Sequence, residues 1–61
     1  MTTMTDKPIT TIDKIACLRR ELALRRNVYP GRVVRRQMSQ ESADREIAVM
    51  TAMLKDYEAQ E

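Results

Sequence analysis

Apolar residues return at helical spacing through the first half of the chain. Their steps of three, four and seven residues are typical of one face of an α-helix, and the positions are Ile12, Ile15, Leu18, Leu22 and Tyr29. Thr10 or Thr11 can cap the start of this helix, and Asp13 lies in the first turn, where the helix dipole favours a carboxylate. The pattern predicts a helix that begins near residue 10.

A break signal follows at Tyr29-Pro30-Gly31. Pro30 has no amide hydrogen and disfavours helical geometry at Tyr29, and Gly31 adds backbone freedom. Either the helix ends near Val28, or it is kinked near Pro30 and continues to about Gln37. We favour the kinked continuation, because the arginines and valines after Gly31 keep their helical alternation.

The second half of the chain carries the most regular apolar pattern. Ser39 is a suitable helix N-cap, with Glu41 in the first turn. Apolar residues then follow at alternating steps of four and three, as in a heptad repeat, at Ala43, Ile47, Met50, Leu54 and Tyr57. Two helices joined by a short turn form an antiparallel helical hairpin. The predicted fold is all-α, with packing by Ile15, Leu18, Leu22, Ile47, Met50, Leu54 and Tyr57.

Chain length points to a second copy. We expect residues 1–9 to be a flexible N-terminus and residues 10–61 to be one hairpin domain, which is marginal in size for independent stability. Cys17 is the only cysteine and histidine is absent, which excludes an intrachain disulfide and a histidine-containing zinc site. A homodimer with a four-helix arrangement is therefore expected.

The first helix also has a weaker apolar stripe at Cys17, Leu24 and Val28. This stripe fits a second contact, or it consists of scattered apolar residues on the surface.

Charge is divided unequally along the chain. Residues 1–38 hold nine basic residues against three acids, a net +6, and residues 39–61 hold two against six, a net −4. Arginines recur every six or seven residues along the first helix. They can form a solvated face balanced by the acidic helix, bind nucleic acid or anchor a protein partner. We favour a protein partner over nucleic acid, because arginine outnumbers lysine and suits partly buried ion pairs.

Catalytic chemistry is not expected. Without histidine the usual acid–base residue at neutral pH is missing, and Cys17 has no base to activate it. A single glycine excludes a glycine-rich phosphate loop. We therefore predict no enzyme activity, cofactor, metal or small-molecule ligand.

No apolar run reaches the length of a membrane span or of a signal sequence, so a cytoplasmic protein is expected.

One set of residues resembles the pattern of a known protein family. The residues Glu21-Leu22, Arg25, Val28-Tyr29-Pro30 and Val33, followed by Met38, Ala43, Glu46-Ile47 and Met50, are similar to a family of small phage and prophage proteins. This family includes the quorum-sensing anti-activator of Pseudomonas phages, and the resemblance covers roughly residues 14–58. Relatives often carry a bulky aromatic residue shortly after the Tyr-Pro step, and this chain has none there.

The resemblance implies a dimeric helical hairpin made early in phage infection. Such proteins bind a LuxR-type transcriptional activator of the host over its DNA-binding region, and the anti-activator is also associated with inhibition of the type IV pilus assembly ATPase. The residues implied at the partner surface are Tyr29 and its arginine neighbours: Arg25, Arg26, Arg32, Arg35 and Arg36. Core packing at the hairpin turn is the alternative role for Tyr29. An RNA- or DNA-binding hairpin dimer is the alternative function.

Overall fold

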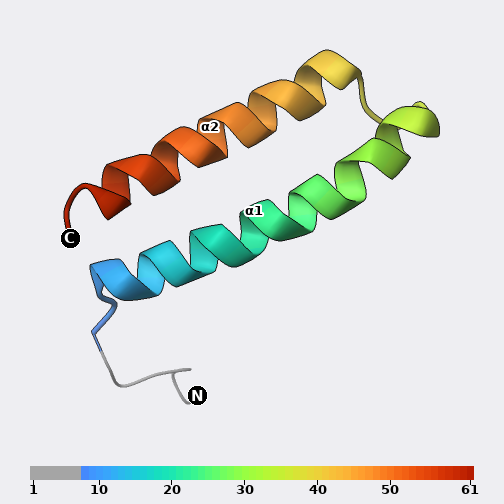
Figure 1. Cartoon of the computed structure of the whole chain (residues 1–61). Coiled ribbons are helices and arrows are strands. Elements are labelled where there is room, and N and C mark those ends of the chain that lie inside the picture. Colours follow the sequence, from blue (N-terminus) through green and yellow to red (C-terminus); the bar gives the residue numbers. More distant parts are fainter. Residues whose placement is uncertain (1–7) are drawn as a thin grey trace.

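A computed structural model describes residues 8–61, which form two helices that lie antiparallel, side by side (Figure 1). Helix α1 spans Thr11–Val34 and helix α2 spans Gln40–Glu58. The predicted all-α hairpin is confirmed. Most of the predicted flexible N-terminus lies outside the described residues. The predicted dimerisation stays a prediction, because the structure is of one chain.

Helix α1 begins with a reciprocal cap. The Thr10 side-chain oxygen accepts a hydrogen bond from the Asp13 amide at 3.1 Å, and the Asp13 carboxylate accepts one from the Thr10 amide at 3.0 Å. This capping box satisfies two of the amide groups that a helix start leaves unpaired. Of the two cap residues that the sequence allowed, the structure uses Thr10.

Helix α1 continues through Pro30 and ends at Val34. An end near Val28 is therefore wrong, and a continuation to Gln37 is three residues too long. Pro30 offers no amide hydrogen to the carbonyl of Arg26, four residues earlier. Both residues are exposed, so water can solvate that carbonyl, and the helix tolerates the proline. The kink near Pro30 stays a prediction.

A Schellman turn closes α1. The Gln37 amide donates to the Arg32 carbonyl at 2.8 Å, and the Arg36 amide donates to the Val33 carbonyl at 3.0 Å. Such a turn needs a left-handed residue just after the helix, a position that glycine usually occupies. Here Arg36 occupies it, with φ of 60°. The chain then enters α2 at Ser39, whose hydroxyl accepts from the Ser42 amide at 3.0 Å.

The core is a single row of contacts between the two helices. Ile15, Leu22 and Tyr29 of α1, spaced by seven residues, are buried together with Ala43 of α2. Of the seven residues predicted to pack, Ile15 and Leu22 are buried and the other five are half-buried. The packing of one helix on another therefore covers only part of each apolar face.

The left-handed arginine leads to a stability prediction. We expect Arg36→Gly to raise the free energy of unfolding by about 1 kcal/mol, because glycine adopts positive φ without the steric cost of a Cβ. Arg35, the C-cap, has φ of −83°, so Arg35→Gly is the matched control and should not stabilise. Urea denaturation at one fixed protein concentration measures both. Equal or lower stability of Arg36→Gly would contradict the prediction.

Candidate interaction surfaces

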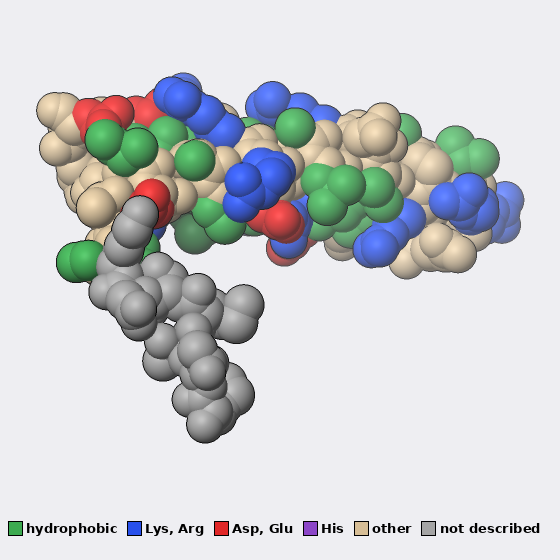
Figure 2. Space-filling model, turned by 90° about the horizontal axis from the view of Figure 1, so that it is seen from below, with side chains coloured by type: hydrophobic (Ala, Val, Ile, Leu, Met, Phe, Trp, Pro, Cys, Tyr) green, Lys and Arg blue, Asp and Glu red, His purple; other side chains and the backbone are tan. Residues whose placement is uncertain are grey.

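The turn between the helices forms a basic tip. We define the hairpin tip as residues 32–40, which contain Arg32, Arg35 and Arg36, all exposed. No acidic residue occurs between Glu21 and Glu41 in the sequence. Figure 2 shows this end of the molecule, at the right, with basic side chains and no acidic ones on the visible face. The tip therefore carries three positive charges, and the first acidic residue after it is Glu41, in the first turn of α2.

Ion pairs confirm that imbalance. Within residues 8–61, two pairs come within 4 Å: Arg19 with Glu58 and Arg25 with Glu21. The tip arginines and Arg26 have no carboxylate within that distance in this part of the chain. Among them lies Val34, the large apolar residue with the greatest exposure, at 81%. The tip thus combines unpaired guanidinium groups with an exposed apolar side chain, a composition found where proteins bind partners.

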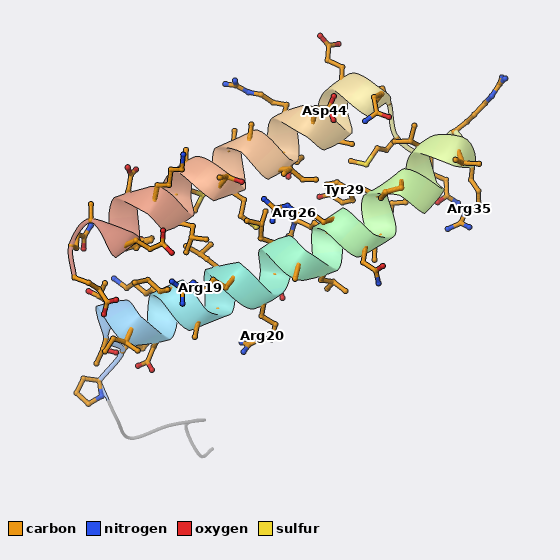
Figure 3. All side chains as sticks on the ribbon, in the orientation of Figure 1. Arg19, Arg20, Arg26, Tyr29, Arg35 and Asp44 are labelled. Carbon is orange, nitrogen blue, oxygen red and sulfur yellow. The ribbon has the colours of Figure 1, made fainter. Side chains whose placement is uncertain are left out.

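Tyr29 does not belong to the tip surface. It is only 9% exposed, and Figure 3 shows its ring between α1 and α2. Of the two roles open to Tyr29 in the sequence, the structure shows core packing. Tyr29 lies directly before the tip, because Val33 of the tip follows it by one turn of the same helix. A role in direct contact with a partner would require the hairpin to open.

Arg26 lies beside the second helix. It lines a crevice of about 210 Å³ together with Tyr29 and Pro30 of α1 and Ala43 and Asp44 of α2. Arg26 and Asp44 form no ion pair, and the Asp44 carboxylate instead accepts from the Gln40 amide group at 2.9 Å. Arg26 is exposed. It is therefore separated from the tip arginines but remains accessible to a partner that reaches along the hairpin.

Arg25 has a different environment from the other arginines. Its Nη1 donates to the Glu21 carboxylate at 2.7 Å, one helical turn earlier, and its side chain is 29% exposed. This hydrogen bond raises the pKa of Arg25 above its ordinary value, against the opposing effect of desolvation. The Nε atom of Arg25 is buried and has no hydrogen-bond acceptor in the described chain. A buried donor without an acceptor is uncommon and costly.

At the end of the hairpin opposite the tip, an ion pair and a cation–π contact connect α1 and α2. Arg19 Nη2 contacts the Glu58 carboxylate at 2.8 Å across the two helices, and Lys14 Nζ lies 5.4 Å from the centre of the Tyr57 ring. The sequence shows that arginines recur every six or seven residues along the first helix, but not which carboxylate Arg19 meets. Only the register of α2 against α1 decides that partner.

One broad side of the hairpin is apolar and uncovered. Lys14 approaches Tyr57 on this side, and Met50 and Met53 share it, because they precede Tyr57 by seven and four residues on α2. Leu24 and Val28 lie on the same side of α1, in a hollow of about 190 Å³ that also includes Glu21, Arg25 and Arg32. We call this side the open face, and its apolar residues are Leu18, Leu24, Val28, Val49, Met50, Met53 and Tyr57.

Exposure on the open face is high for apolar side chains. Leu24 is 52% exposed, Met53 43% and Val49 42%. A partial signal for this face is present in the sequence, where Cys17, Leu24 and Val28 form a second apolar stripe. Of the α2 residues on this face, Met50 and Tyr57 are predicted from the sequence to pack in the core or the dimer, and Val49 and Met53 are not among the predicted packing residues.

The described chain shows no sign of a metal site or a membrane span. No three side chains of the types that bind metals through sulfur, nitrogen or carboxylate oxygen come together in residues 8–61. No helix in the same residues is long and apolar enough to cross a bilayer. Comparison of the chain with protein families, curated proteins and solved structures finds no match in any of the three.

Burial of Tyr29 predicts a stability effect. We expect Tyr29→Ala to lower the free energy of unfolding by about 3 kcal/mol, the usual cost of removing a buried aromatic ring. Tyr29→Phe, which keeps the ring, and Arg26→Ala, which changes an exposed side chain, should change it far less. Thermal and urea denaturation followed by circular dichroism measure all three variants. Unchanged stability of Tyr29→Ala would show that the ring is not a core residue.

Proposed function

We propose that this chain is a non-enzymatic binding protein and that the hairpin tip is its recognition surface. The observation that carries the proposal is the set of exposed arginines at positions 32, 35 and 36, which have no carboxylate within 4 Å in residues 8–61. Arginine is favoured at binding hot spots, because its planar guanidinium pairs with carboxylates through two hydrogen bonds. Val34 adds apolar area to the same surface.

The partner chemistry follows from the sign of the charge. A basic tip selects an acidic surface, and it is repelled by a basic one. The family resemblance noted in the sequence adds a target class: a LuxR-type transcriptional activator of a bacterial host, bound at its DNA-binding region, and also the type IV pilus assembly ATPase. We propose that the chain acts in this way, in the host cytoplasm, as a phage-encoded inhibitor.

Binding to the DNA-binding region of an activator restricts the orientation of the hairpin on that protein. DNA-binding surfaces are basic, so the tip must contact an acidic patch of the activator beside its DNA-binding surface. The C-terminal part of α2 contains Asp56, followed by Glu61. These two carboxylates, unlike Glu58, which pairs with Arg19, suit the basic DNA-binding surface itself. The polarity of the hairpin thus fixes the orientation in which such a complex forms.

The recognition role of the tip is tested by removing two charges. We expect Arg35→Gln/Arg36→Gln to weaken binding to a purified LuxR-type activator at least tenfold, or about 1.4 kcal/mol, because two hot-spot arginines lose their carboxylate partners. The control Arg20→Gln/Lys55→Gln removes the same charge from exposed positions outside the tip, and Figure 3 shows Arg20 directed away from α2. Isothermal titration calorimetry measures both. Equal weakening by the two variants would overturn the tip as the recognition surface.

Nucleic acid is the second candidate, because a stretch of five arginines without an acid between Glu21 and Glu41 also suits a phosphate backbone. The two candidates differ in salt dependence. Binding to phosphates should weaken with a slope of about −0.9 per neutralised phosphate in a plot of log affinity against log salt. We expect the affinity for a 20-base-pair RNA or DNA duplex to stay weaker than that for the activator between about 50 and 200 mM salt. Tighter duplex binding would favour the nucleic-acid function.

A further inference from the structure

The open face needs a cover that brings its own carboxylate. In the single hairpin, Leu24, Val49 and Met53 remain 42–52% exposed, on a domain whose small size makes its stability marginal with one row of core contacts. Arg25 lies among these residues: its Nη1 pairs with Glu21, and its side chain, 29% exposed, lines the hollow of this face. Covering this face with a purely apolar surface would bury a guanidinium that Glu21 satisfies only in part, which is costly.

A second copy of this chain meets that requirement. Helix α1 has six basic residues and two acids, a net +4, and α2 has two basic residues and five acids, a net −3. If two hairpins meet through their open faces about a two-fold axis parallel to the helices, α1 of each lies on α2 of the other. Opposite charges then face one another, and all neighbouring helices are antiparallel, which also suits their dipoles.

The other two-fold arrangement is disfavoured by charge. An axis perpendicular to the helices and lying between the two open faces would stack α1 on α1, +4 against +4, and α2 on α2, −3 against −3. Like charges directly opposite one another across an interface destabilise it. The charge difference between the two helices therefore selects the arrangement in which α1 lies on the partner's α2.

The register of the hairpin identifies the carboxylate that Arg25 meets. Ala43, Asp44 and Ile47 of α2 line the same crevice as Arg26 and Tyr29 of α1, so Glu46 lies at nearly the same height along the hairpin as Arg25. A rotation about an axis parallel to the helices keeps that height. The partner's Glu46 then lies within about one helical turn, roughly 5 Å along the axis, of Arg25.

Glu46 also has the right orientation and is free to pair. It precedes Met50 by four residues and Met53 by seven, so it lies on the open-face side of α2. It is exposed and takes part in neither of the ion pairs of residues 8–61. Glu46 is therefore the available acceptor on the surface that α2 offers to a second copy.

We propose that the open face is the homodimer interface, and that Arg25 pairs with the partner's Glu46 twice, once on each side of the two-fold axis. The inference rests on the homodimer that belongs to the proposed function, and it adds the face, the helix pairing and the ion pair. Leu18, Met50 and Met53 form the apolar centre between the two ion pairs, and Leu24 and Val28 lie at its edge, beyond Arg25. Of the tip arginines, Arg32 lines the hollow of the open face, whereas Arg35 and Arg36 do not.

A charge swap tests the proposal on the full chain. Analytical ultracentrifugation should give twice the chain mass of 7.1 kDa for the native sequence. We expect Arg25→Glu and Glu46→Arg each to raise the dimer dissociation constant at least tenfold, because each places like charges across the interface. The double variant Arg25→Glu/Glu46→Arg should regain most of the native affinity, since opposite charges face each other again. Recovery of this kind is not expected if either change only harms the folding of the hairpin.

Controls separate this interface from the tip. Arg20→Glu makes the same charge change on an exposed part of α1 outside the open face and should leave the dimer intact, as should Arg35→Gln/Arg36→Gln. A native chain that stays at 7.1 kDa at about 100 µM, the working range for weak association, would overturn the proposal. A double variant as weak as the single ones would overturn the Arg25–Glu46 pairing. A native chain that forms the dimer but does not bind the activator would refute the proposed function and leave the dimer proposal intact.

Discussion

The whole structure depends on one row of contacts between two helices. Ile15, Leu22 and Tyr29 recur every seven residues on α1, and Ala43 is the buried residue of α2 that packs with this row. A seven-residue repeat keeps these side chains on one narrow side of α1, so α2 can cover only that side. The open face and the basic tip are consequences, because two helices in contact leave their remaining sides to solvent or to a partner.

Reversal of the chain also arranges the charge. Because α2 returns antiparallel to α1, its acidic C-terminal part lies beside the start of α1, where Arg19 pairs with Glu58. The basic stretch from Arg25 to Arg36 lies toward the other end, and the middle of the hairpin has the Arg25–Glu21 pair. The net charge of +2 therefore conceals a molecule that is polar along its length.

The two proposed surfaces are compatible with each other. A dimer about an axis parallel to the helices leaves both tips uncovered and places them at the same end. Arg35 and Arg36 of both copies would then face one partner, and binding through two linked sites exceeds the affinity of either one. Such an arrangement concentrates positive charge at that end, and an acidic partner would relieve the repulsion. In the proposed dimer, binding of an acidic partner would therefore favour self-association electrostatically.

Local signals in the sequence determined both helices, the Ser39 cap, the charge division and the all-α hairpin, because spacing and capping act within a few residues. Long-range contact decided the rest. Tyr29 is buried because α2 packs against it. Helix α1 passes Pro30 at an exposed position, and Arg36 adopts a left-handed conformation where the chain turns into α2. The missing acceptor of Arg25 depends on which side chains surround it, which no spacing of residues specifies.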